Sequence, residues 1–370
     1  MISISLCMIV KNEEEVLAGC LDSVKGIADE FVIVDTGSAD ATKEIAARYT
    51  DMIYDFEWTD HFADARNFAF SKASKDYILW MDADDVLTDE DRKKLADLKI
   101  SLSPDIDAVS MYYHVGFDER GEVNFKYRRN RLVKREKGFR WIGAVHEYLE
   151  VYGNILETDI AVTHRKHHKT AAPPSDRNLK IYEKMVEGNQ TLTPRDLFYF
   201  ANELKDHKQY NRAITYYHHF LATKQCWIED EIRTCQYLSD CYRALGHEEA
   251  ALHSLLKSFL FDQPRPEFCC RLGDYFKEKQ KYREGAFWYE LALSAKSSDS
   301  GFTQVEYSTW YPHLQLCVCY WQLGDKKTAK QHNDLAASFH PTHPSVLFNK
   351  KHIRRTIRMK ALKKDQGHSP

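Results

Sequence analysis

One short segment limits the choice of fold more than any other part of the sequence. It is an apolar run, Tyr77–Met81, that ends in the three carboxylates Asp82, Asp84 and Asp85. A buried strand that delivers acids at its carboxyl end places them where open α/β sheets bind their ligands. Because neighbouring carboxylates repel one another, a site that keeps them ionised requires a cation. Mg²⁺ and Mn²⁺ are usually held by oxygen ligands together with substrate phosphates, so the segment predicts a metal-dependent nucleotide-diphosphate site in an enzyme.

Strand-like and helical patterns alternate through the first half of the chain. The strand-like runs are Ile2–Val10, Phe31–Asp35, Met52–Tyr54 and Tyr77–Met81, and each is followed by a helical pattern. Strand starts that lie roughly 20 to 25 residues apart are typical of βαβ units, which predicts an α/β domain with a largely parallel sheet. Neither a Gly-x-Gly-x-x-Gly turn nor a Gly-x4-Gly-Lys loop is present, which argues against a dinucleotide Rossmann site and P-loop chemistry.

Two helices and several later strands can be placed from their residues. Asn12 is a suitable N-cap for a helix with apolar residues at helical period, namely Val16, Leu17, Cys20, Leu21 and Val24. A second helix is expected over residues 64–71. After Asp107 the pattern changes to shorter strands, expected at Ala108–His114, Val123–Tyr127, Arg129–Val133 and Ile160–His164.

The second half of the chain is helical and repetitive. From about Arg195 onward strand signals vanish, and polar turns followed by an alanine recur at Ala213, Ala250, Ala286 and Ala329, with intervals of 37, 36 and 43 residues. Helix pairs at such intervals resemble a degenerate tetratricopeptide repeat, which predicts an all-α repeat domain. Stacked pairs form a solenoid whose concave face suits an extended peptide or another subunit. The alternative is that the helices only buttress the first domain or form a homodimer.

Composition excludes several classes of protein. A chain of 370 residues suggests two domains, and a net charge of −3 argues against a general nucleic-acid binder. No run of about 18 apolar residues exists, so no membrane span is expected. Nine irregularly spaced cysteines fit a reducing cytoplasm, and the first residues form a strand pattern rather than a signal peptide.

The domain boundaries follow from a linker signal and a charge run. Residues 170–175 contain two prolines among small residues, which stops regular structure. We therefore predict an α/β domain with the nucleotide-diphosphate site over residues 1–170, a helical repeat domain over 171–350 and a basic tail over 351–370. The basic run that leads into the tail is either a solvated helix end or a patch for an anionic partner.

Four motifs in the first 165 residues resemble those of family 2 glycosyltransferases with the GT-A fold. They are Ser5-Leu6-Cys7-Met8-Ile9-Val10-Lys11-Asn12-Glu13-Glu14, Asp35-Thr36-Gly37-Ser38, Asp64-Ala65-Arg66-Asn67 and Asp82-Ala83-Asp84. The Val145-His146-Glu147 region and the repeat-like second half make the whole chain similar to bacterial peptide glycosyltransferases of the sublancin (bacteriocin) S-glycosyltransferase type. One position departs from the pattern, because Ala39 stands where such enzymes commonly carry threonine.

The resemblance implies an activity and a set of partners. It implies an inverting, metal-dependent transfer of a hexose or N-acetylhexosamine from a UDP-sugar to a peptide acceptor, through a Cys thiol or a Ser/Thr hydroxyl. A saccharide or lipid-linked acceptor of the cell envelope is the first alternative. A repeat scaffold carrying a catalytically decayed domain is the second.

The same resemblance assigns roles to individual residues. Asp84 would bind Mg²⁺ or Mn²⁺, and His164 would complete the metal shell and favour Mn²⁺. Asp35 would accept a hydrogen bond from uracil, although an Asx turn is its simpler interpretation. The nucleotide-binding set would comprise Val10, Asn12, Glu13, Asp35, Gly37, Asp64, Arg66, Asp82 and Ala83.

Two further groups are assigned from the chemistry of transfer. Glu147, with His146 beside it, is the best candidate for the general base that an inverting enzyme needs. Arg129 and Arg131 share one face of an alternating strand and could hold the diphosphate.

Overall fold

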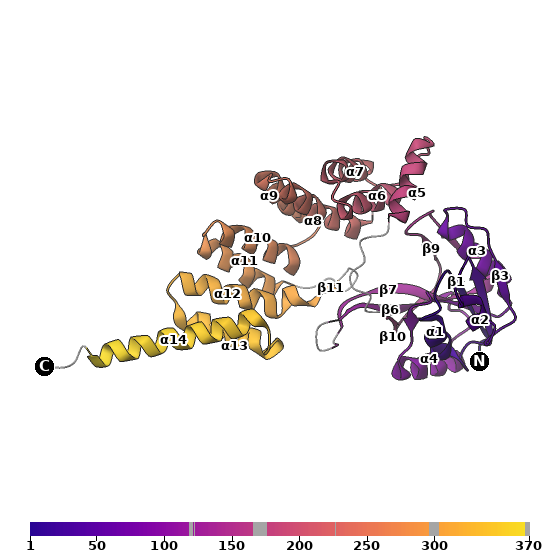
Figure 1. The fold of residues 1–370 in the computed structure, drawn as a ribbon, viewed down its shortest axis with the longest axis horizontal. Coiled ribbons are helices and arrows are strands. Elements are labelled where there is room, and N and C mark those ends of the chain that lie inside the picture. Colours follow the sequence, from indigo (N-terminus) through magenta and orange to yellow (C-terminus); the bar gives the residue numbers. More distant parts are fainter. Residues whose placement is uncertain (118–120, 122, 166–175, 226, 296–302, 367–370) are drawn as a thin grey trace. The chain divides into compact units, whose positions relative to one another are not determined.

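The computed structural model describes residues 1–117, 121, 123–165, 176–225, 227–295 and 303–366, with side chains described up to Thr356. Its contacts divide the chain into two compact units, Met1–His207 and Lys208–Pro370. Figure 1 labels their helices and strands. The linker expected at residues 170–175 and most side chains of the basic tail lie outside the described residues.

The first unit is built on one twisted sheet. Its strands follow the order β3-β2-β1-β4-β7-β6-β10-β5. Their bounds are β1 (Ile4–Val10), β2 (Glu30–Asp35), β3 (Ile53–Asp55), β4 (Tyr77–Trp80), β5 (Asp85–Val86), β6 (Ala108–Phe117), β7 (Val123–Lys134) and β10 (Ile155–His164). Strand β1 pairs in parallel with β2 and β4, β2 with β3, and β6 with β10. The predicted α/β class with a mostly parallel sheet is therefore confirmed.

One later strand differs from its prediction. The two short strands expected at Val123–Tyr127 and Arg129–Val133 are a single strand, β7, which runs antiparallel between β4 and β6. Beyond it, β8 (Arg140–Ile142) and β9 (Tyr148–Glu150) form a separate antiparallel pair.

Side-chain alternation along β1 divides the core of this unit into two layers. Leu6 and Met8 belong to a buried cluster that includes Leu17 of α1 (Leu17–Val24) and Leu95 of α4 (Asp89–Ser101). Cys7 points to the opposite face, where it packs in a cluster with Ala69 of α3 (Phe62–Lys72). Each fully buried Leu or Met side chain contributes about 1.5–3 kcal/mol, so this alternation fixes the register of the central strand.

The helix expected directly after Asn12 begins later in the chain. Helix α1 starts at Leu17 with Val16 as its N-cap, so the N-cap role predicted for Asn12 is wrong. Asn12 has a φ of 56°, a left-handed conformation that asparagine tolerates. Its backbone N–H donates to Ser38 Oγ at 2.9 Å, and its Oδ1 accepts from the N–H of Ala39 at 2.8 Å. Asn12 therefore ties the end of β1 to the turn after β2, just before α2 (Thr42–Ala46).

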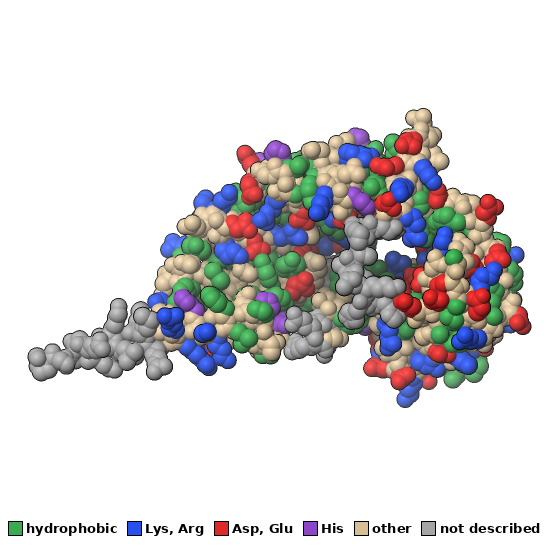
Figure 2. Space-filling view, viewed as in Figure 1, with side chains coloured by type: hydrophobic (Ala, Val, Ile, Leu, Met, Phe, Trp, Pro, Cys, Tyr) green, Lys and Arg blue, Asp and Glu red, His purple; other side chains and the backbone are tan. Residues whose placement is uncertain are grey.

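The second unit is helical. Its helices are α7 (Tyr210–Thr223), α8 (Ile228–Ala244), α9 (Glu248–Lys257), α10 (Pro266–Glu278), α11 (Tyr282–Ser294), α12 (Trp310–Gln322), α13 (Lys326–Phe339) and α14 (Pro344–Gln366). The strongest helix–helix packing joins α8 with α9, α10 with α11 and α12 with α13, as a repeat of helix pairs requires. Apolar side chains also reach its surface, as the green patches of Figure 2 show. None of the described helices is long and apolar enough to cross a membrane.

Small residues fill the crossings of the helix pairs. Ala213, Ala286 and Ala329 are buried as the repeat pattern predicts, whereas Ala250 is half-buried and its neighbour Ala251 takes the buried position. The predicted spacing of the helix pairs is therefore correct, but in the pair of α8 and α9 the buried alanine lies one residue later than predicted.

Two helices after the predicted linker belong to the first unit. Helices α5 (Arg177–Glu187) and α6 (Pro194–Asp206) were expected in the repeat domain, but the division by contacts falls after His207. Their polar contacts explain this: Tyr182 donates a hydrogen bond to the carbonyl of Val145 at 3.4 Å, and Lys184 pairs with Asp60. Helical periodicity does not reveal such long-range contacts.

Gly273 of α10 provides a test of the repeat packing. A Cβ added there would lie 2.6 Å from the ring of Tyr289 of α11, so Gly273→Ala should overpack the pair and lower the free energy of unfolding by about 1–3 kcal/mol. Chemical denaturation followed by circular dichroism measures this loss. The matched substitution Gly19→Ala meets no atom within 4 Å in α1 and should be neutral or stabilising. Equal stability of Gly273→Ala and the unsubstituted protein would contradict the packing described.

Candidate active site

An acidic loop follows β4 at the carboxyl end of the sheet. Asp82 and Asp85 close the loop, because the N–H of Asp82 donates to Asp85 Oδ2 and the N–H of Asp85 donates to the carbonyl of Asp82, both at 3.0 Å. Strand β5 then pairs antiparallel with β10, which places His164 directly opposite Asp85. The loop therefore joins residues that lie about 80 positions apart in the sequence.

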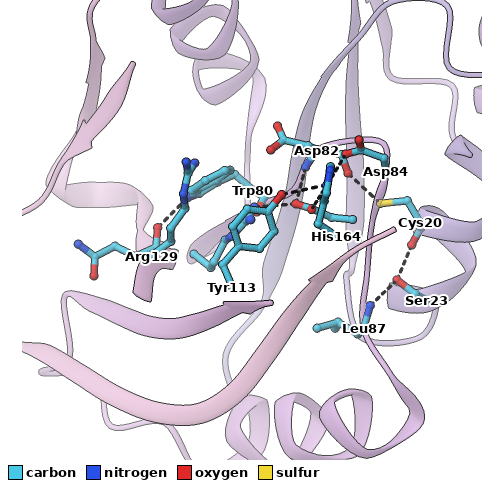
Figure 3. Close-up of polar contacts among 12 residues, drawn as sticks. Cys20, Ser23, Trp80, Asp82, Asp84, Leu87, Tyr113, Arg129 and His164 are labelled. Atoms are coloured by element: carbon cyan, nitrogen blue, oxygen red, sulfur yellow. Dashed lines mark hydrogen bonds and ion pairs between the residues drawn. The ribbon is translucent and has the colours of Figure 1, made fainter. Parts of the chain in front are cut away.

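Helix α1 supports both ends of this loop. Cys20 donates through its thiol to the carbonyl of Asp82 at 3.4 Å. Ser23 Oγ accepts from the N–H of Leu87 at 3.2 Å, as Figure 3 shows. The burial of Cys20 raises the pKa of its thiol, an effect that the nearby carboxylates reinforce, so Cys20 is a neutral structural residue.

Asp84, Asp85 and His164 form a cluster suited to a metal ion. One potential ligand atom from each residue lies within 4.8 Å of the others. His164 Nδ1 lies 3.4 Å from Asp84 Oδ1 and 3.8 Å from Asp85 Oδ1. The hydrogen bond with Asp84, followed by the contact with Asp85, raises the pKa of His164 to about 9. The side chain of Asp84 is 37% exposed and that of Asp85 is 0% exposed, so Asp84 is the acid that a ligand can reach.

A buried ion pair lies beneath the cluster. Arg131 Nη1 is 2.9 Å from Asp85 Oδ2, and neither side chain is exposed to solvent. The second oxygen of Asp85, Oδ1, has no hydrogen-bond partner among the described residues. His164 Nδ1 faces this oxygen at 3.8 Å, which is too far for a hydrogen bond. A buried carboxylate oxygen without a hydrogen-bond donor is costly unless a cation lies close to it, so a metal ion beside Asp84 and His164 would fit this position.

The two arginines expected to hold the diphosphate do share one face of β7. The guanidinium of Arg131 lies over the rings of Trp80 at 3.9 Å and Tyr113 at 4.5 Å, and that of Arg129 lies 5.5 Å from both rings. Figure 3 shows Arg129 beside these rings. Arg131 is fully buried against Asp85, so a contact with the diphosphate is not open to it, and the structure corrects this part of the prediction.

Arg66 of α3 links two carboxylates. Its Nη2 is 2.7 Å from Asp82 Oδ1 and its Nε is 2.5 Å from Glu147 Oε1, while Trp80 and Trp141 lie against its guanidinium at 5.3 and 4.7 Å. Burial opposes the ionised form of Asp82, but the charges of Arg66 and Arg131 outweigh it and lower the pKa of Asp82.

Asp64 was expected to join this group but does not. His61 is the N-cap of α3 and accepts through Nδ1 from the backbone N–H of Asp64 at 3.2 Å, and the carboxylate of Asp64 lies 3.2 Å from the same nitrogen. Asp64 does not belong to the residues that line the cleft described below, and its predicted contact with the nucleotide stays a prediction.

A cleft opens beside the acidic loop. Of the predicted residues it is lined by Val10, Glu13, Arg66, Asp82, Ala83 and Asp84. It is also lined by Ile9, Lys11, Thr36, Trp58, Phe62 and Arg177, none of which the sequence motifs assigned to the site. Asn12 and Gly37 do not line the cleft themselves, but both belong to loops that contribute lining residues.

Asp35 ends β2 on the same edge of the sheet. Its Oδ1 accepts hydrogen bonds from the N–H groups of Gly37 and Ser38, each at 2.9 Å, so the expected Asx turn is present. Its Oδ2 is buried and has no hydrogen-bond partner among the described residues. One oxygen of Asp35 therefore supports the turn, and the other is buried without a hydrogen-bond partner among the described residues.

Helix α6 holds the His146–Glu147 loop. His146 has a φ of 51°, its Nε2 lies 2.9 Å from Glu203 Oε1, and its ring stacks on Tyr199 at 4.3 Å. Arg195 donates to the carbonyl of His146 at 3.0 Å. Burial opposes ionisation of Glu203, but hydrogen bonds from His146 and Asn178 outweigh it and lower the pKa of Glu203. The imidazole of His146 is therefore bonded to a carboxylate of α6.

Comparison with known proteins identifies the domain that contains this cleft. The family model of glycosyl transferase family 2 matches residues 5–148. A TPR repeat-containing protein of Synechococcus elongatus is 46% identical over 150 residues, which cover 40% of this chain and 36% of that protein. The SPbeta prophage-derived glycosyltransferase SunS of Bacillus subtilis is 28% identical over 225 residues, covering 58% of this chain and 52% of SunS.

A third relative is named for lipopolysaccharide synthesis. The lipopolysaccharide core biosynthesis glycosyltransferase LpsC of Rhizobium meliloti is 32% identical over 161 residues, covering 41% of this chain and 58% of LpsC. The chain thus spans between about a third and somewhat more than half of the length of these relatives. The acidic loop, Asp35, Arg66 and Glu147 all fall inside the matched segment, and the part of this chain that carries them, residues 5–148, is a glycosyl transferase family 2 domain.

Proposed function

We propose that the chain transfers a hexose or N-acetylhexosamine from a UDP-sugar to a peptide or protein acceptor, with inversion at the anomeric carbon. The observation that carries this proposal is the cluster of Asp84, Asp85 and His164 at the edge of a cleft in a family 2 domain. Clefts at the carboxyl ends of parallel strands are where α/β sheets bind nucleotides. The free thiols of the eight described cysteines agree with a cytoplasmic enzyme.

A divalent ion fits the residues present. Asp84 and His164 would hold it, and the unpartnered Oδ1 of buried Asp85 would support it from behind. Imidazole is an unusual ligand for Mg²⁺, which favours Mn²⁺. When bound, the ion would neutralise charge on the diphosphate leaving group.

The nucleotide and the acceptor have separate candidate partners. The unpartnered Oδ2 of Asp35 suits the N–H donor of a uracil ring. In the transfer step the acceptor sulfur or oxygen forms a bond to the anomeric carbon as the carbon–oxygen bond to the diphosphate breaks. The electron pair of that bond leaves with UDP, and the acceptor proton passes to the carboxylate of Glu147, which Arg66 orients.

The helical repeats support a peptide acceptor. Leu260, Phe287 and Phe348 are 80%, 58% and 68% exposed in the second unit. Solenoids of stacked helix pairs present extended concave surfaces that they use for binding, and exposed apolar side chains are available on this repeat unit. The likeness to LpsC, a lipopolysaccharide core biosynthesis glycosyltransferase, keeps a saccharide or lipid-linked acceptor as the second candidate.

Removal of the accessible acid tests the metal site. Asp84→Ala should lower UDP-sugar turnover by at least about 100-fold and abolish Mn²⁺-dependent binding of UDP, as measured by calorimetry. EDTA should do the same to the unsubstituted enzyme. Asp97→Ala, an exposed acid on α4, is the matched control and should change neither quantity. Full turnover by Asp84→Ala in the presence of EDTA would refute the proposal.

The role of Glu147 is tested by an isosteric change. Glu147→Gln keeps an acceptor for Arg66 but cannot take a proton, so kcat should fall about 10²- to 10⁴-fold while the Kd for UDP stays constant. With a thiol acceptor, the decrease in kcat should become smaller above pH 8.5, because the thiolate forms there without a general base. The exposed Glu150→Gln on β9 should behave like the unsubstituted enzyme. An unchanged kcat in Glu147→Gln would assign the base elsewhere.

The acceptor class is decided by a direct comparison. Radiolabelled UDP-glucose and UDP-N-acetylglucosamine are offered with Cys-, Ser- and Thr-containing peptides, with oligosaccharides and with lipid-linked saccharides. We expect label in the peptide fraction. Label in the saccharide or lipid fraction alone would favour the second candidate. Retained UDP binding without transfer to any acceptor class would favour a scaffold.

A further inference from the structure

Two aromatic side chains, Trp58 and Phe62, line the cleft beside the acidic loop. Trp58 lies in the segment that joins β3 to α3, and Phe62 is the first residue of α3. Neither ring carries a charge for a diphosphate or an oxygen ligand for a metal ion. Their presence beside the acidic loop therefore indicates that the cleft also receives an apolar or planar part of its ligand.

The backbone places Trp58 beside the end of β2. Asp35 pairs in register with Asp55 of β3, and its carbonyl accepts from the N–H of Phe56 at 2.8 Å. The chain therefore leaves β3 directly alongside Asp35, and Trp58 follows Phe56 by two residues. Thr36, the residue after Asp35, lines the same cleft as Trp58. The indole thus belongs to the part of the cleft wall next to Asp35, whose buried Oδ2 has no hydrogen-bond partner among the described residues.

Two contacts hold the indole ring of Trp58 in a defined orientation. Its Nε1–H donates to Asp60 Oδ1 at 3.0 Å, and its ring meets that of Phe62 with the centres 4.7 Å apart and the planes at 73°. Asp60 is held in turn by its ion pair with Lys184 of α5. Because the hydrogen bond of an indole lies in the plane of the ring, it fixes the ring without occupying a face. A ring that is oriented in advance loses little rotamer freedom when a ligand stacks on it.

We infer that Trp58 stacks on the uracil base of the nucleotide-sugar donor, while the carboxylate of Asp35 accepts a hydrogen bond from the edge of the same base. This inference rests on the proposed function and adds a donor-binding residue to it. Stacking on an aromatic side chain accepts any base, because every base has a π-face. Asp35 would therefore select the base by its hydrogen-bond donor, and Trp58 would supply affinity.

The test compares a ligand that has the base with a ligand that lacks it. Calorimetric titrations of the full-length protein with UDP and with inorganic pyrophosphate, each with Mn²⁺, give two dissociation constants for every variant. Trp58→Ala should raise the Kd for UDP about 5- to 150-fold and change that for pyrophosphate by less than about twofold. Trp58→Phe, which keeps an aromatic ring, should lie between. Thr59→Ala, an exposed neighbour in the same segment, should match the unsubstituted protein.

Tryptophan fluorescence provides a second measurement, which does not require Trp58→Ala to fold. A base that stacks on an indole quenches its emission, so saturating UDP with Mn²⁺ should quench the unsubstituted protein and pyrophosphate should not. The quenching by UDP should be lost in Trp58→Phe. It should persist in Trp227→Phe, which removes an exposed indole of the second unit.

The possible results separate this inference from the proposed function. If Trp58→Ala binds UDP as the unsubstituted protein does, or if quenching persists in Trp58→Phe, Trp58 does not stack on the base although the proposed function stands. An equal rise in Kd for UDP and pyrophosphate would assign the effect to the shape of the cleft and overturn the inference. A rise for UDP-glucose without a rise for UDP would place the ring on the sugar and overturn it too. If the unsubstituted protein itself fails to bind UDP with Mn²⁺, both proposals fall.

Discussion

The buried ion pair of Arg131 and Asp85 is the contact on which the acidic loop depends. Three carboxylates within four residues would repel one another at the end of a strand whose surroundings exclude water. Arg131 neutralises Asp85 from below and Arg66 neutralises Asp82 from the side. Asp84 is 37% exposed, has His164 beside it and has no arginine paired with it in these contacts, whereas the partly exposed Asp82 is paired with Arg66. The two arginines thus neutralise Asp82 and Asp85, while the carboxylate of Asp84 lies beside His164 at the cleft. Because an unpaired buried charge costs several kcal/mol, neither arginine can be removed without disturbing the loop.

Trp80 connects this charge network to the core. The guanidinium groups of Arg66, Arg129 and Arg131 all lie within 5.5 Å of its ring, and its indole N–H donates to the carbonyl of Asn130 at 2.7 Å. An aromatic face attracts cations more strongly where water is excluded, so one side chain of β4 orients three arginines from two other elements. The rigidity of the loop therefore comes from β4 and β7 together, which explains why an antiparallel strand lies at the centre of an otherwise largely parallel sheet.

The sequence predicted the parts of the site that depend on local pattern. Alternating apolar residues and strand spacing were enough to place Asp35 and Asp84 on one edge of the sheet, since carboxyl ends of parallel strands meet there. Alternation also showed that Arg129 and Arg131 share a face, but it could not show that this face is buried against Trp80 and Tyr113. Burial depends on which strands flank β7, a non-local property. The N-cap prediction for Asn12 was wrong for a related reason. Asparagine suits both an N-cap and a left-handed turn, and only the contact with Ser38, which is distant in sequence, decides between them.

Helical periodicity could not predict that α5 and α6 pack on the first unit. Their contacts with it explain why this unit ends after α6. Helix α5 brings Arg177 to the wall of the cleft, and α6 holds the backbone and ring of His146 through Arg195, Glu203 and Tyr199. A residue with positive φ such as His146 is strained and keeps its conformation only where its surroundings determine it. The direction of Glu147, the next residue, is therefore set by the contacts of His146 with α6 and by its own ion pair with Arg66. Helix α5 therefore contributes a residue to the wall of the cleft, and α6 holds the loop whose Glu147 pairs with Arg66 of that wall, so both helices support the first unit.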